Sequence, residues 1–120
     1  LSYAHAGIKE MDAAVAMAPD NVEVRVVRAE NNFHMPRFMG REPTVKADLE
    51  WLWDKVRPKP AAFSPDLVQT VALLHGQVLK REKHKDQAVQ VWEWGLSVDP
   101  KSTLAREIRE QLGHAGVRAP

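Results

Sequence analysis

The segment from Val71 to Pro100 constrains the fold of this chain more than any other stretch. Small residues and one very large residue recur in it at intervals that suit two antiparallel helices joined by a short turn: Ala72, Gly76, Ala88, Trp92 and Gly95. Small side chains let two helices approach closely, and an indole ring between them fills the remaining gap. Pro100 ends the second helix because proline has no N–H and its ring clashes with the preceding turn. The sequence therefore predicts a helical hairpin here.

This spacing resembles the tetratricopeptide repeat, a helical hairpin of about 34 residues whose members mostly bind other proteins. Two departures stand out: His75 takes a position where the family usually has Leu, and Leu79 takes one where it usually has an aromatic residue. A carboxylate clamp known in some members needs Lys, Asn and Arg at positions that this chain fills differently. The resemblance implies a right-handed superhelix of stacked hairpins that binds a protein or peptide.

Two weaker copies of this repeat pattern precede the copy at residues 71–100. A partial copy ends at Pro19, and a remodelled middle copy has Ala29 and Ala47 at the small positions with Trp51 between its helices. In this register the partner helix of the first copy lies upstream of Leu1. Because the chain also begins without Met, we expect it to be a fragment of a longer protein.

Helical periodicity predicts six helices, with no convincing strand alternation anywhere in the chain. Their expected ranges are 3–18, 22–34, 44–56 (or from Glu42), 64–82, 85–98 and 102–113. Asp20 with Glu23 is the expected capping box of the second helix, and Ser64 before Pro65 is the expected cap of the fourth. The predicted fold is all-α: residues 1–120 form a single domain of stacked antiparallel helical hairpins.

Composition excludes several functional classes. Seventeen basic against sixteen acidic residues leave a net charge of +1, which gives no general attraction to nucleic acid. No apolar run reaches the eighteen or so residues that a membrane span needs. The chain has no Cys, hence no thiolate nucleophile and no disulfide. We expect a soluble protein without nucleic-acid binding or membrane insertion, and both a cytoplasmic and an exported location stay open.

Catalytic and metal motifs are equally scarce. There is no nucleophile elbow and no zinc-protease motif, and the carboxylates of Asp48, Glu50 and Asp54 are interpreted as a solvated helix surface. His34, Met35 and Met39 combine ligands that suit copper(I). The favoured alternative is that the apolar side chains of this stretch pack into the break between two helices: Phe33, Met35, Phe38 and Met39. We therefore expect no enzyme, no metal and no cofactor.

A partner-binding groove is the strongest functional hypothesis. In the family that the chain resembles, the first helix of each pair lines the concave face. In this chain that position belongs to the second and fourth helices. On the second helix, Arg25, Arg28 and Asn32 recur at i, i+3 and i+7 and would form one polar stripe able to bind carboxylates. A solvated or internally paired face is the alternative. Further candidates, as exposed interface anchors, are Trp94 and whichever of Trp51 and Trp53 faces outward. Self-association is the second hypothesis, because the first helix lacks a partner.

Overall fold

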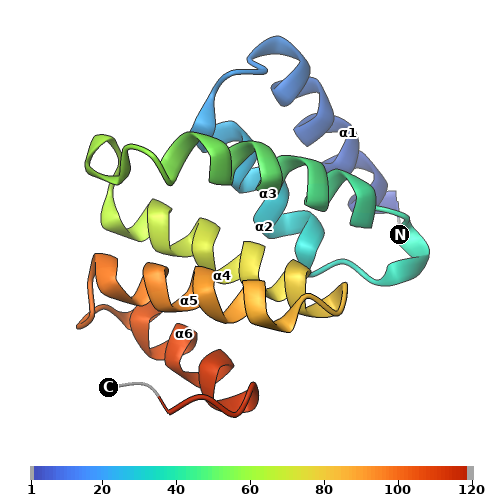
Figure 1. Ribbon diagram of the computed structural model, residues 1–120. Helices are drawn as coiled ribbons and strands as arrows, with labels where there is room; N and C mark the ends of the chain where they lie inside the picture. Colours follow the sequence, from blue (N-terminus) through green and yellow to red (C-terminus); the bar gives the residue numbers. More distant parts are fainter. Residues whose placement is uncertain (1, 119–120) are drawn as a thin grey trace. The chain divides into compact units, whose positions relative to one another are not determined.

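The computed structural model describes residues 2–118, and within that range helices are the only regular secondary structure (Figure 1). Six α-helices and two short 3-10 helices follow one another: α1 (Ser2–Met17), α2 (Val22–Phe33), η1 (Arg37–Met39), α3 (Glu42–Val56), η2 (Pro60–Ala62), α4 (Pro65–Arg81), α5 (Lys85–Val98) and α6 (Thr103–His114). The all-α prediction is confirmed, and the ends of each predicted helix lie within two residues of the observed ends. The chain divides into two compact units, Leu1–Leu52 and Trp53–Pro120.

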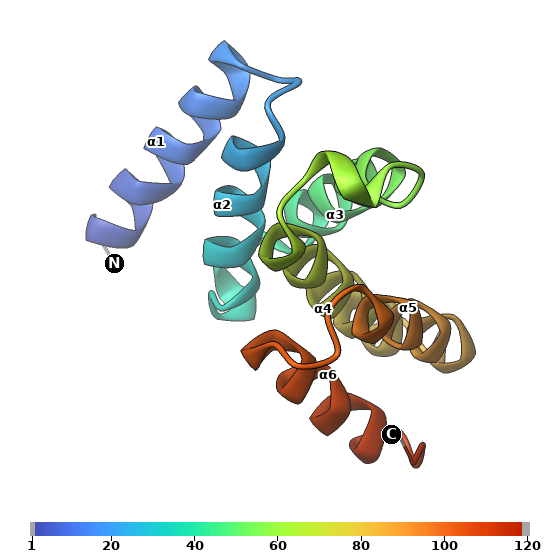
Figure 2. The same ribbon diagram turned by 90° about the vertical axis from the view of Figure 1, so that its left-hand side faces the viewer.

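In the first unit, α1 and α2 lie side by side (Figures 1 and 2). The turn between them ends at Asn21, whose Oδ1 accepts a hydrogen bond from the backbone N–H of Val24 at 2.9 Å. The predicted capping box with Asp20 is therefore wrong. Asp and Asn cap helices about equally well, so the decisive factor is position, and Asn21 directly precedes the first helical residue.

The break between α2 and α3 is a single 3-10 turn. It ends at Gly40, whose φ of 71° lies in the left-handed region that glycine adopts without steric cost. Phe33 is buried, as the packing interpretation of this stretch requires, but the side chain of Phe38 is 73% exposed. That interpretation is wrong for Phe38, because the 3-10 turn carries its ring outward.

In the second unit, α4 and α5 form the predicted antiparallel hairpin. Trp92 is fully buried between them, and its indole Nε1 donates a hydrogen bond to the Leu73 carbonyl at 3.1 Å. A Cβ on Gly76 would run into that indole ring, and a Cβ on Gly95 would lie 2.6 Å from the Cβ of Ala72. The close approach of α4 and α5 therefore requires glycine at positions 76 and 95, as the spacing in the sequence predicts.

The third helix of this unit, α6, packs on α5 and on α4. Its apolar stripe is fully buried at Ala105, Ile108 and Leu112. Ser64 caps α4 through the N–H of Leu67, as predicted, and Ser102 caps α6 through that of Ala105. None of the helices in the part of the chain described here combines the length and apolar character of a membrane span.

The buried side chain of Gln69 on α4 connects the ends of the other two helices. Its Nε2 donates to the carbonyls of Gly95 and Asp99, each at 3.0 Å, and its Oε1 accepts from the hydroxyl of Ser102. One amide on α4 thus satisfies polar groups at the end of α5 and at the beginning of α6.

Candidate binding site

Arg25 and Arg28 share a face of α2, and both guanidinium groups meet the carboxylate of Asp48 on α3. Arg28 binds it bidentately, with Nε 2.7 Å from Oδ2 and Nη2 2.7 Å from Oδ1. Arg25 donates from Nη1 to Oδ1 at 3.1 Å and from Nε to the carbonyl of Pro19 at 2.7 Å. Asp48 has an exposed fraction of 0%. Its interpretation as a solvated carboxylate is therefore wrong, because two cations from α2 cover it.

The ion pairs continue toward α1. Arg28 Nη1 lies 3.1 Å from Asp12 Oδ1, and Arg41 pairs with the same oxygen. The pKa of Arg28 lies above its usual value because Asp48 accepts its hydrogen bonds, although partial burial acts in the opposite direction. This arrangement keeps the guanidinium fully charged and holds it between two carboxylates.

Asn32, the third residue of the predicted stripe, is buried one turn further along α2. Its Oδ1 is 3.4 Å from Arg41 Nε, and its Nδ2 has no hydrogen-bond partner in the described part of the chain. The stripe therefore exists as a row of residues, but its donors point largely into the first unit. The role of this stripe in partner binding stays a prediction. Because both guanidinium groups are already paired, they leave few free donors for a partner.

Trp94, the fourth predicted residue, belongs to an aromatic group in the second unit. Its ring meets that of Trp53 edge to face, with centroids 5.1 Å apart and an interplanar angle of 84°. The other contact of Trp53 is with His75, whose ring stacks on it at 5.2 Å. The guanidinium of Arg57 lies 4.8 Å from the centroid of Trp94, within the range of a cation–π interaction. Both Trp side chains are half-buried.

These rings border an open hollow of about 320 Å³. It is lined by Trp53, Arg57, His75, Leu79, Gln87, Gln90, Val91 and Trp94. That volume lies at the small end of the range for ligand pockets and suits one large side chain better than a cofactor. Stacking, apolar contact, amide hydrogen bonds and one cation are the interactions that this lining provides.

His75 is the buried polar member of the lining. It is only 9% exposed, and its Nδ1 has no hydrogen-bond partner among the described residues. Burial lowers its pKa below the usual value, against the opposing effect of the carboxylates of Asp54 and Glu82. The imidazole is therefore neutral at pH 7 and serves the hollow as an aromatic wall.

Sequence reasoning found Trp94 and offered Trp53 as an alternative to Trp51, but it missed the rest of this lining. The signal on α5 was present, since Gln87, Gln90 and Trp94 follow one another at i, i+3 and i+7. Nothing local marks Arg57 or decides between Trp51 and Trp53, because proximity to Trp94 depends on how α3, α4 and α5 pack.

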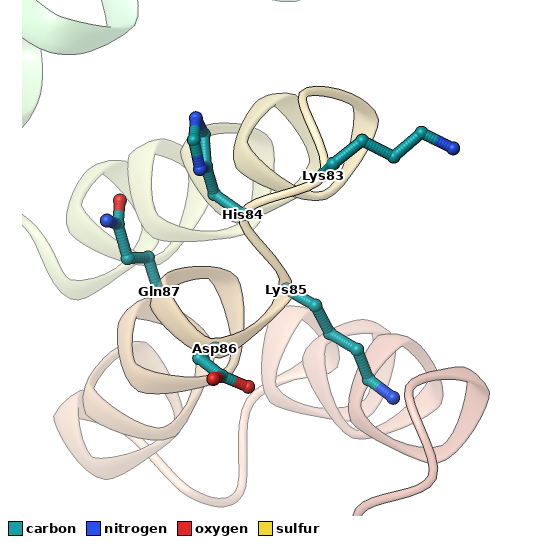
Figure 3. Close-up of a pocket in the computed structure, with 5 residues that line it drawn as sticks. All are labelled: Lys83, His84, Lys85, Asp86 and Gln87. Carbon is teal, nitrogen blue, oxygen red and sulfur yellow. The ribbon is translucent and has the colours of Figure 1, made fainter.

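A second hollow, of about 290 Å³, lies in the turn between α4 and α5 (Figure 3). Its lining is the basic segment Lys83 to Gln87. Figure 3 shows the side chains of Lys83 and Lys85 extending away from those of His84 and Gln87. The charged groups do not converge on one point, so this hollow is a weaker candidate than the aromatic one.

Comparison of this chain with protein-family models, with curated proteins and with solved structures finds no match in any of the three.

Proposed function

We propose that this chain is a non-enzymatic module of the tetratricopeptide-like class that binds a protein or peptide partner. The observation that carries the proposal is the aromatic hollow of the second unit, where Trp53 and Trp94 stay half-buried although ring contacts hold them in place. Trp is the side chain most enriched among the residues that dominate binding energy at interfaces. Fixing its orientation in advance lowers the entropy cost of binding.

The hairpin beneath the hollow supports the class assignment. Gly76, Trp92 and Gly95 pack as the repeat pattern requires, so α4 and α5 can present a rigid surface. A right-handed superhelix that extends this hairpin is part of the proposal, because stacked hairpins create the extended surfaces on which such proteins bind their partners.

The test is affinity capture of partners from an extract of the native host. Trp94→Ala is compared with Glu93→Ala, which changes an exposed neighbour on the same helix. We expect wild type and Glu93→Ala to recover the same partners and Trp94→Ala to lose most of them. Circular dichroism establishes that all three proteins are equally folded. Equal recovery by the Trp94 variant refutes this hollow as the binding surface.

A second candidate function is self-association through the first unit. Three apolar side chains there are largely exposed, namely Met17, Val27 and Phe38. Covering them with another copy of the chain would remove that surface from water. Sedimentation velocity over a hundredfold concentration range tests this, with Phe38→Ser as the variant. A wild-type protein that stays monomeric throughout rules out this candidate.

A further inference from the structure

The charge of Arg57 is the feature of the aromatic hollow that the packing of the chain does not use. In the first unit, Arg25, Arg28 and Arg41 all pair with Asp carboxylates. Arg57, by contrast, is exposed and has no carboxylate partner among residues 2–118. Its contact with the face of Trp94 holds the guanidinium at the edge of the hollow. A guanidinium stacked in this way keeps its N–H fork available for a carboxylate.

The shape of the hollow indicates an extended ligand. Gln87, Gln90 and Trp94 lie on one face of α5, and at 1.5 Å per residue they span about 10 Å along the helix axis. An extended peptide covers that distance in about three residues. The two glutamine side chains are exposed, so their amides can both donate to and accept from a passing peptide backbone.

The charges around the hollow restrict where an acidic group can lie. Lys83 and Lys85, in the basic turn, extend away from Gln87 (Figure 3). The carboxylates of Asp54 and Glu82 both act on His75, which is part of the lining. A negatively charged ligand group is therefore favoured at Arg57 and disfavoured beside His75.

We propose that the aromatic hollow takes an extended segment of a partner protein in which an aromatic side chain is flanked by acidic residues. The aromatic ring enters the hollow and packs against Trp53 and Trp94, and one flanking carboxylate pairs with Arg57. This inference rests on the function proposed above, and it specifies the chemistry of the partner.

The probes are two blocked tripeptides, acetyl-Glu-Phe-Glu-amide and the uncharged acetyl-Gln-Phe-Gln-amide. Each is titrated into the ¹⁵N-labelled full chain while the indole N–H signals are followed by NMR. We expect the signals of Trp53 and Trp94 to move. That of Trp92 should stay in place, because its N–H is bonded inside the hairpin.

The acidic peptide should bind about two to five times more tightly than the uncharged one, the range expected for an exposed ion pair. In Arg57→Gln this preference should disappear, whereas Arg106→Gln, an exposed change on α6, should retain it. Equal affinity of wild type for the two peptides, or no binding of either, overturns the inference.

Two further results separate this inference from the proposed function. Partner capture that depends on Trp94 but is unchanged in Arg57→Gln leaves the function standing and overturns the carboxylate contact. A labelled single-stranded oligonucleotide that moves the same indole signals at lower concentration than the acidic peptide overturns the choice of a protein ligand, since stacking on Trp also suits nucleobases.

Discussion

Replacing Asp48 by Asn should destabilise the first unit strongly, because one fully buried carboxylate holds the guanidinium groups of both Arg25 and Arg28. Removing one partner of a buried ion pair costs about 3–5 kcal/mol, since the remaining charge is left without compensation. Here the two Arg side chains are 17% and 14% exposed, so water can solvate part of their charge. We therefore expect the lower end of that range, about 3 kcal/mol.

Urea denaturation followed by circular dichroism measures the effect. With a denaturant slope of about 1.5 kcal/mol per molar for a small protein, a loss of about 3 kcal/mol moves the midpoint of the affected transition by about 2 M. Asp54→Asn, an exposed carboxylate change on the same helix, is the control and should shift the midpoint little. A midpoint for Asp48→Asn within about 0.5 M of wild type would refute the claim that this carboxylate organises α2 and α3.

Three further outcomes follow from the second unit. Gly76→Ala should destabilise the second unit by about 3 kcal/mol, because the new methyl group collides with the Trp92 ring. Gly113→Ala, with open space around the new methyl group, should be neutral or slightly stabilising. Similar melting temperatures for the two variants would contradict this packing. Because the pKa of His75 is lowered by folding, the unfolded state binds the proton first, so the free energy of unfolding should fall as the pH drops below about 6.5, by at most about 1.4 kcal/mol per pH unit. His75→Gln should flatten that dependence in a series of urea titrations, and an unchanged slope would show that His75 does not cause it. Ser102→Ala should lower the free energy of unfolding in urea by about 1–2 kcal/mol, since it removes the cap of α6 and the hydrogen bond to Gln69. Lys101→Ala, an exposed substitution beside it, is the control, and an equally small loss of stability in both variants would argue against that role.

Local signals in the sequence predicted the helices and one hairpin well. Prolines and helical periodicity located all six helices, and the spacing of Gly76 and Trp92 identified the hairpin, because both depend on residues close together in the chain. The cap at Asn21 was missed by one residue, a difference that periodicity cannot resolve. The exposure of Phe38 follows from the direction of a 3-10 turn, which its sequence does not specify.

The candidate sites were harder to predict for a physical reason. Arg25, Arg28 and Asn32 were found as a stripe, but Asp48, the partner of the two arginines, lies 23 and 20 positions away from them on another helix. Whether such a stripe faces a ligand or an internal carboxylate depends on helix packing. The same holds for Arg57, which becomes part of the aromatic hollow only when α3 lies near Trp94.

The amide of Gln69 implies that α6 does not open independently of the hairpin. If α6 detached, the Ser102 hydroxyl would leave Oε1 of a fully buried side chain without a donor, beside the last turn of α5. Local opening of α6 should therefore loosen the backbone N–H groups near Asp99 as well. Native-state hydrogen exchange should then show the end of α5 and the start of α6 exchanging together, as one cooperative segment that crosses the turn between them.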